Sequence, residues 1–244
     1  MKLVPLLCSA ASLLVFSAVA FAQNGTVTGT VKFSGAAPTQ KPFAVPSAFP
    51  TCGKEKPLDR LILGKDNGVA NTVVYIEGLK KKNPVANAPT ILADQKECHY
   101  EPHVSVVADG DAFTVQNSDA TFHNVHGYFD ADHSTTFNLA QPTKGLKMVQ
   151  HVKKPGMYFL RCDIHPWMNA YVFVAGDGYA TVSDADGKFT LSNVPPGTYK
   201  LVMWHEGWTS KVAENRPTFS EAVQQSQQIT VVADKPTTAD FTLK

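Results

Sequence analysis

The sequence predicts an all-β protein, and three features of the chain support this fold class. Short stretches in which apolar and polar residues alternate recur along the chain, as they do in half-buried strands. The 16 glycines and 16 prolines among 244 residues separate these stretches with frequent turn signals. No long stretch after residue 22 has the apolar spacing of an amphipathic helix. A chain of this length accommodates one large domain or two small ones.

The expected strands follow from this alternation. In residues 25–33, for example, Val27, Val31 and Phe33 alternate with threonine and lysine. Residues 214–228 are polar and less regular, and they predict a loop or a short helix. The further strand patterns lie at residues 72–76, 103–107, 112–117, 157–162, 170–174, 181–189, 194–201 and 228–243.

The first 22 residues have the composition of a secretory signal peptide. Lys2 gives a short positive start, residues 3–21 are apolar and uncharged, and Ala20 and Ala22 form an A-x-A cleavage site. Cleavage after Ala22 predicts a periplasmic or secreted protein that begins at Gln23. The alternative is a transmembrane anchor, which the short apolar length and the small terminal residues disfavour. We expect no transmembrane segment in the mature chain.

The charge balance gives no sign of a polyanionic partner. The chain has 22 basic and 21 acidic residues, and removal of Lys2 with the signal peptide leaves 21 of each, a formal net charge of zero. Nucleic acids and anionic membrane surfaces attract strongly basic proteins. We therefore expect neither as a partner, and the sequence does not indicate an oligomeric state.

Three cysteines remain in the mature chain, namely Cys52, Cys98 and Cys162. An odd number in an exported protein leaves at least one outside an intramolecular disulfide. If Cys162 serves as a metal thiolate, Cys52 and Cys98 remain to pair, and an oxidising compartment favours that bond. The bond would pin the proline-rich connection at residues 34–57, which is unusually long for a free loop.

One short stretch carries three different metal-binding groups. Cys162, His165 and Met168 offer a thiolate, an imidazole and a thioether within seven residues. Copper is the metal that uses one cysteine, two histidines and a weak axial methionine as a set. Each residue also has a simpler interpretation: a buried free cysteine, an exposed loop histidine and a core methionine that fills a gap. Their mutual spacing favours a metal centre.

His123 and His126 are the candidates for a second imidazole. They are three residues apart, so in a strand they would face opposite ways, whereas a turn could bring both to a metal. The residues by themselves leave this choice open.

Residues 96–176 resemble the cupredoxins, the small blue copper proteins, at the plastocyanin end of that family. A strand at residues 113–117 leads to the run His123-Asn124-Val125, and a second strand, Gly-x-Tyr-x-x-x-Cys, ends in Cys162-x-x-His165. The order of these motifs along the chain is more specific than any one of them. The resemblance implies a Greek-key β-sandwich.

The same resemblance implies a set of site residues. It assigns one mononuclear type 1 copper to His123, Cys162, His165 and Met168, and it favours His123 over His126. Asn124 would then tie the two ligand loops together by hydrogen bonds. His126 remains as an alternative ligand or as a neighbour of the ligands.

The loop after Cys162 departs from the plastocyanin pattern. Only two residues separate His165 from Met168, a gap that resembles the binuclear copper domain of terminal oxidases. That binuclear site needs two cysteines, and here Ile164 precedes His165 with no second cysteine nearby. A mononuclear centre is therefore expected, and the short loop is expected to set the length of its bond to Met168.

The rest of the chain resembles a carboxypeptidase-regulatory or transthyretin-like β-sandwich. The resemblance rests on the opening pattern at residues 25–31, on Asp186-Gly187-Lys188-Phe189 and on the Val-Pro-Pro-Gly-Thr-Tyr run at residues 194–199. The opening pattern precedes the cupredoxin-like stretch and the other patterns follow it. We therefore expect that the cupredoxin domain is inserted into the regulatory-like sandwich. The expected domains are a signal peptide at 1–22, a split regulatory-like sandwich at 23–95 and 176–244, and a cupredoxin domain at 96–175.

These resemblances imply an exported electron-transfer protein that meets a redox partner protein. Pro166 and Trp167 could form an exposed apolar patch where electrons enter, although Trp167 could instead pack the loop. The alternatives are a copper-delivery protein of metal homeostasis and a non-catalytic binding module.

We expect no enzyme, because the chain offers no Ser-His-Asp arrangement, phosphate-binding glycine loop or further histidine cluster. Trp204-His205-Glu206 could line the interface with the copper domain or cap a strand. The remaining histidines are expected to be structural; they are His99, His103, His133, His151 and His205.

Overall fold

The structure is a computed structural model that describes residues 23–58, 60–79, 91–152, 154–176, 178–213 and 216–244. The described residues form an all-β protein, as the sequence predicts, with two short 3₁₀ turns, η1 (Pro50–Cys52) and η2 (Lys65–Asn67). The expected signal peptide lies outside the described residues. In the described part of the chain, no helix has the length and hydropathy of a membrane span.

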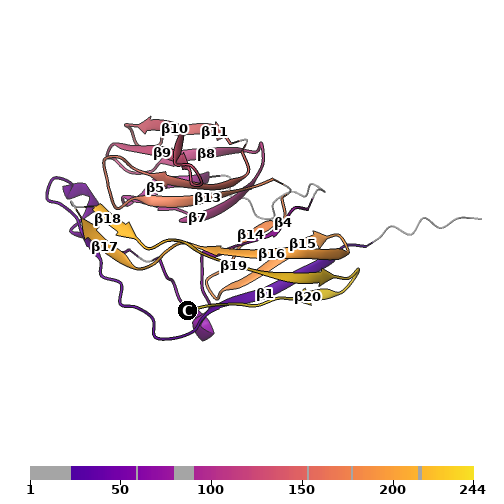
Figure 1. The fold of residues 1–244 in the computed structure, drawn as a ribbon. Helices are drawn as coiled ribbons and strands as arrows, with labels where there is room; N and C mark the ends of the chain where they lie inside the picture. The colour runs from indigo at the N-terminus through magenta and orange to yellow at the C-terminus, as the bar shows by residue number, and fades with distance from the viewer. Residues whose placement is uncertain (1–22, 59, 80–90, 153, 177, 214–215) are drawn as a thin grey trace, which may run out of the picture.

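One sandwich is built from the middle of the chain (Figure 1). Its larger sheet has the order β10-β9-β12-β13-β7, and its smaller sheet has the order β11-β8-β5-β6. The strands alternate buried and more exposed residues, as in the eBiBiB pattern of β8, because one face of each sheet lies on a shared core. The strand bounds are β5 (Ile91–Lys96), β6 (His99–Glu101), β7 (Val104–Ala108), β8 (Ala112–Asn117), β9 (His123–Phe129), β10 (Ser134–Gln141), β11 (Lys147–His151), β12 (Gly156–Arg161) and β13 (Asn169–Ala175).

The second sandwich combines strands from both ends of the described chain. One sheet has the order β14-β4-β16-β19, and in the other β1 pairs with β15, β20 and β21. The strand bounds are β1 (Gly25–Phe33), β4 (Val73–Glu77), β14 (Ala180–Val182), β15 (Lys188–Val194), β16 (Gly197–His205), β19 (Val223–Val231), β20 (Pro236–Thr238) and β21 (Phe241–Leu243). Segments before and after the first sandwich therefore share sheets, which is the arrangement that an insertion requires.

Two sequence expectations need correction. The strand β5 pairs with β6 and β8, so residues 91–95 belong to the first sandwich and the boundary that we expected after residue 95 moves to a point before β5. Residues 216–219 and 223–231 form strands rather than a loop or a short helix. The glutamines of β19 misled the prediction because β19 lies at the edge of its sheet, where one face is polar. The division into two domains itself stays a prediction.

The two sandwiches pack against each other through β7 and β13 on one side and β4, β14 and β16 on the other (Figure 1). Aromatic rings fill this interface: Tyr75 lies 4.5 Å from Phe173, and Tyr171 lies 4.9 Å from Trp204, between ring centroids. Trp204 thus lies at the interface, one of the two places that the sequence allowed for it.

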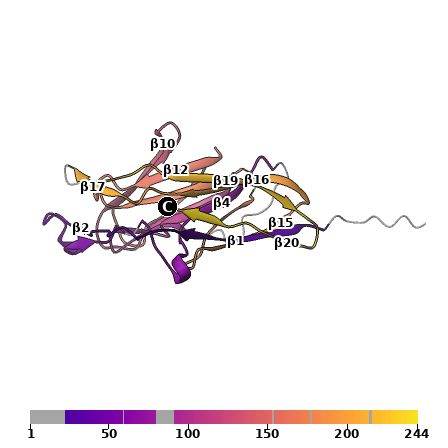
Figure 2. The ribbon, with the colours of Figure 1, turned by 60° about the horizontal axis from the view of Figure 1, so that its bottom comes forward.

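Two small hairpins lie at one end of the molecule (Figure 2). The connection after β1 runs to this end and forms β2 (Phe43–Ala44) and β3 (Glu55–Lys56), and the other hairpin is β17 (Ser210–Ala213) with β18 (Arg216–Phe219). A Cys52–Cys98 disulfide fixes the connection to the turn between β5 and β6, as expected. This segment matters for the site, because it covers one side of it.

Candidate metal centre

Strand pairing brings the two predicted ligand segments to the same end of one sheet. His123 is the first residue of β9, Cys162 follows the last residue of β12, and β12 pairs with both β9 and β13. The loop between β12 and β13 closes on itself, since the Cys162 N–H donates to the Met168 carbonyl (3.2 Å) and the Met168 N–H donates to the His165 carbonyl (2.9 Å). The loop residues are therefore held close to the start of β9.

Three donor atoms converge there. His123 Nδ1 lies 3.0 Å from His165 Nδ1, and Cys162 Sγ lies 3.6 Å from the same His165 nitrogen. The three side chains are at most 2% exposed. Among the described residues, the other donor groups of comparable spacing include Cys52 or Cys98, whose sulfurs are joined in the disulfide. The His123–Cys162–His165 cluster is thus the one with a free thiol.

The histidines of this cluster are prepared to act as neutral ligands. His123 Nε2 donates to Asp119 Oδ2 (2.9 Å), which leaves the Nδ1 lone pair directed into the cluster. Burial lowers the pKa of His123, although Asp119 acts in the opposite direction. Burial and then the proximity of His123 lower the pKa of His165 to about 4. Both rings are therefore uncharged at neutral pH, the form that binds metals.

Cys162 is held as a thiol by its surroundings. Burial raises the pKa of the Cys162 thiol, even though its contacts with Asn124 and His165 lower it. Its Sγ–H donates to Asn124 Oδ1 (3.3 Å). A cation bound at this point would remove the thiol proton, because metal coordination stabilises the thiolate.

Asn124 joins the segment that carries His123 to the loop that carries Cys162 and His165. Its Oδ1 also accepts a hydrogen bond from the Asp163 N–H (2.8 Å), and its Nδ2 donates to Asp163 Oδ2 and Asn138 Oδ1 (2.8 Å each). One side chain thereby fixes the residue next to Cys162 relative to the residue next to His123.

The structure separates the two candidate histidines. His126 lies outside the donor cluster, where its Nδ1 contacts Asp163 Oδ2 (2.9 Å) and its ring stacks on Tyr128 at 4.1 Å. Three residues along β9 place it on the opposite face of the strand from His123, which points inward. His126 is therefore a neighbour of the loop that carries Cys162, not a member of the cluster.

We call residues 162–168, between β12 and β13, the ligand loop. Met168 is its last residue and is 1% exposed. Its backbone closes the loop onto both Cys162 and His165. These bonds place Met168 in the same closed loop as Cys162 and His165.

The apolar patch expected at Pro166 and Trp167 is not exposed. Trp167 is 4% exposed; its indole Nε1 donates to the Cys98 carbonyl (3.1 Å), and its ring packs on Phe43 and Phe49, each at 5.5 Å. Pro166 is half-buried. Trp167 thus packs the loop, which is the alternative that the sequence left open, because Phe43 and Phe49 of the connection at residues 34–57 fold over it.

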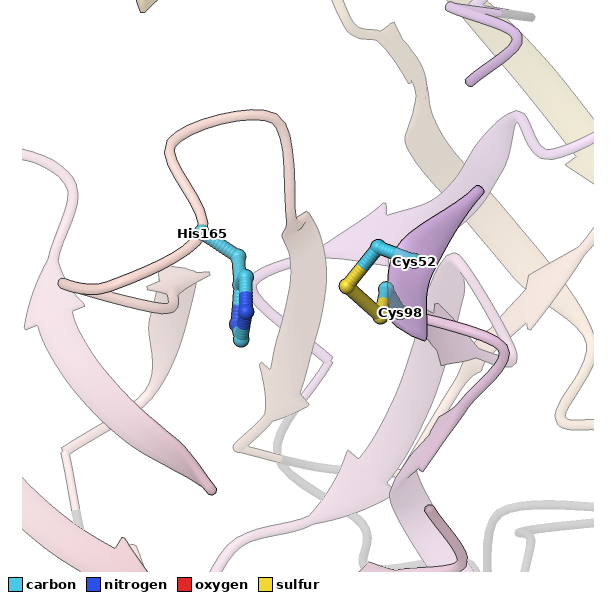
Figure 3. A group of neighbouring side chains, drawn as sticks. All are labelled: Cys52, Cys98 and His165. Atoms are coloured by element: carbon cyan, nitrogen blue, oxygen red, sulfur yellow. A yellow bond between two sulfur atoms is a disulfide. The ribbon is translucent and has the colours of Figure 1, made fainter. Parts of the chain in front are cut away.

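This covering segment also reaches His165. The Phe49 ring lies 4.9 Å from the His165 ring, and the Cys52–Cys98 disulfide lies beside His165, with both sulfurs within 4.8 Å of a ring nitrogen (Figure 3). The large apolar side chains that remain exposed next to the ligands are Phe122 (41%) and Ile164 (37%). Phe122 and Ile164 are therefore exposed to solvent beside the cluster, whereas Trp167 is not.

Asp119 is a functional residue that sequence reasoning missed. Besides its contact with His123, its carboxylate accepts the backbone N–H groups of Glu97 (2.7 Å) and Cys98 (2.8 Å). It thus connects the disulfide-bearing turn to a histidine of the donor cluster. The only signal in the sequence is an acid four residues before His123, which is too common a pattern to stand out.

The sequence profile of the carboxypeptidase regulatory-like domain family matches residues 165–244. This chain is therefore similar to that family from His165, within the loop between β12 and β13, to the end of the match at Lys244. A search of curated proteins finds no match to the sequence.

The structural neighbours are cupredoxins and a copper enzyme. Amicyanin from Paracoccus versutus is 19% identical, over 41% of this chain and 96% of that chain, with a TM-score of 0.31. A purple cupredoxin from Nitrosopumilus maritimus is 23% identical, over 38% of this chain and 94% of that chain, with a TM-score of 0.28. A copper-containing nitrite reductase from Thermus scotoductus is 21% identical (TM-score 0.30), and the match spans 38% of this chain but only 25% of the reductase.

Proposed function

We propose that this chain is an exported copper protein that carries one mononuclear type 1 centre and transfers electrons. The observation that supports it best is the buried convergence of His123 Nδ1, His165 Nδ1 and Cys162 Sγ. One thiolate and two imidazoles with a nearby thioether form the donor set of blue copper sites. Met168 would supply the weak thioether ligand in this proposal.

In this proposal, residues around the cluster hold the copper ligands in place. Copper bound there would supply the change between Cu(I) and Cu(II). Asp119 orients His123 and Asn124 holds the Cys162 loop, so the ligands stay in place whichever oxidation state is present. Since little has to move, electrons can be exchanged with a small reorganisation of the site.

We propose no catalytic role for this centre. An enzyme site at a metal keeps a position open for substrate. Here the ligand side chains are at most 2% exposed, and the covering segment lies across His165. A redox partner protein would instead approach near Phe122 and Ile164, which are exposed beside the two ligand histidines.

The test is the visible spectrum of copper-loaded Cys162→Ser beside that of the original protein and of His126→Ala. The proposal expects the intense thiolate-to-copper band in the original protein and in His126→Ala, and its loss in Cys162→Ser. A copper complex that lacks this band before any substitution would contradict the proposal.

The rival function, copper delivery, uses the same ligands and differs in how readily copper leaves. The buried ligands and the cover over His165 favour retention. Transfer of Cu(I) to a soluble chelator should therefore be slow. Rapid transfer from the intact, disulfide-bonded protein would favour delivery over electron transfer.

A further inference from the structure

A buried ion pair links the two sandwiches close to the candidate metal centre. The Glu206 carboxylate, just after β16, pairs with the Arg60 guanidinium, and the two side chains are 1% and 3% exposed. His103, in the first sandwich, contacts the other Glu206 oxygen. A buried pair of this kind adds little net stability compared with apolar residues, although breaking it is costly. The pair matters here because it holds the Arg60 guanidinium in one place.

Arg60 also contacts the residue that follows the ligand loop. Its Nη2 donates to Asn169 Oδ1 (2.5 Å), and its Nη1 lies 3.3 Å from the Tyr171 hydroxyl. Asn169 Nδ2 in turn donates to the Trp167 carbonyl (3.0 Å). The chain of contacts from Glu206 therefore ends on the two residues that flank Met168.

Open space adjoins the loop between β12 and β13 next to Arg60. A cavity of about 360 Å³ lies between the first sandwich and the β17–β18 hairpin, and another of about 380 Å³ lies toward β6. Arg60, Met168 and Asn169 line both cavities. Beside these cavities, the Arg60–Asn169 contact adds to the loop's own hydrogen bonds and to the packing of Trp167 in fixing the residues that flank Met168.

We propose that Glu206, acting through Arg60 and Asn169, positions the loop that carries His165 and Met168, so that the second sandwich sets the geometry of the metal centre in the first. Glu206 and Asn169 are positioning residues and contact no copper. The copper readouts below rest on the proposed function, whereas the exchange readout does not.

The first test is amide hydrogen exchange of the metal-free protein, followed in peptides that cover residues 162–170. Glu206→Gln keeps the side-chain shape and removes the charge. Asn169→Ala leaves the Arg60–Glu206 pair intact and removes the contacts of Asn169 with Arg60 and with the Trp167 carbonyl. Both should speed exchange in this loop by about tenfold or more. Glu77→Gln removes an exposed pair with Lys200 in the same sandwich and should leave the loop unchanged.

The second test compares the copper-loaded variants. Glu206→Gln and Asn169→Ala should shift the thiolate band and the reduction potential in the same direction. The double variant should shift them no further than the larger single change, because both act through one chain of contacts. Arg60→Lys, which keeps the charge but loses the planar fork, should reproduce the Asn169→Ala shift.

The inference is wrong if loop exchange, band position and potential all stay as in the original protein while only overall stability falls. In that case, the ion pair merely fastens the two sandwiches together. If Glu206→Gln fails to fold, Asn169→Ala still decides the question. If the original protein shows no thiolate band, the proposed function fails. The exchange experiment on the metal-free loop still tests the positioning role of Glu206, because it does not depend on copper.

Discussion

At the scale of single residues, the orientation of one side chain decides which histidine joins the cluster. His123 points into the sandwich and His126 points outward, because they are three positions apart on β9. Asp119 then fixes the ring of His123 by accepting its Nε2–H. A residue that contacts no copper thereby determines which nitrogen the metal would meet.

Asp119→Asn should weaken copper binding by about 10-fold to 100-fold, the usual effect of losing the partner of a ligand histidine. The amide keeps the size of the side chain but loses its negative charge. Asp119 Oδ2 accepts hydrogen bonds from both His123 Nε2–H and the Cys98 N–H, and the neutral amide would hold these two donors less strongly. Competition titration with a copper chelator measures the change. His126→Ala is the matched control, and an equal loss of affinity there would contradict the roles given to the two histidines.

At the scale of elements, the connection at residues 34–57 is a cover held mainly by the disulfide. Apart from the Ser34 N–H, which donates to the Leu243 carbonyl of the second sandwich, its backbone hydrogen bonds among the described residues are internal, such as Val45 N–H to the Lys54 carbonyl. Its links to the first sandwich are the Cys52–Cys98 bond, the aromatic packing of Phe43 and Phe49, and Lys56 Nζ donating to the Glu97 carbonyl.

The double substitution Cys52→Ser with Cys98→Ser should release this cover. The chain-entropy relation for the 46-residue separation gives a loss of unfolding free energy on the order of 4 kcal/mol. Copper should also leave for a chelator several-fold faster, because His165 loses its cover. Chelator kinetics and denaturant unfolding measure the two effects.

A substitution that lowers stability without touching the cover provides the control. Leu191→Ala, in the core of the second sandwich, should cost about 2–5 kcal/mol. It should leave the rate of copper transfer close to that of the original protein under native conditions. If both variants released copper equally fast, the lower stability of the fold would explain the faster release. The cover would then have no role of its own in retaining copper.

At the scale of the whole molecule, a buried charge cluster lies where the sandwiches meet, and it should make stability depend on pH. Burial acts to raise the pKa of Glu206, but the neighbouring charges of His103 and Arg60 outweigh it, and the pKa lies below its usual 4.5. His205 also faces this carboxylate. A carboxyl with a lowered pKa in the folded state stabilises the protein above its unfolded-state pKa of 4.5 and loses that contribution as the pH falls through the lower folded value.

The free energy of unfolding should therefore drop as the pH falls below about 4.5, and part of this slope should be missing in Glu206→Gln. Urea unfolding at several pH values measures the slope. The comparison with Glu206→Gln isolates this residue from other acids with a lowered pKa, such as Asp119 and Asp163. Parallel slopes in the two proteins would contradict the role given to Glu206.

Local patterns predicted much of this architecture. Alternation located most strands, cysteine parity predicted the disulfide, and motif order singled out His123, Cys162, His165 and Met168. Those features depend on residues near one another in the sequence or on simple counting. The cover over Trp167, the Asp119 contact and the Arg60–Glu206 pair depend on segments that meet only after folding, so no local pattern announces them. Residues 223–231 were missed because their polar side chains hid an edge strand.

The measurement that tests the account most directly is the visible absorption spectrum of the purified, disulfide-bonded protein titrated with Cu(II). The account predicts an intense thiolate-to-copper band that grows with copper and saturates at one copper per chain. A titration that gave no such band, or a band that saturated at two coppers per chain, would contradict the mononuclear His123–Cys162–His165 centre.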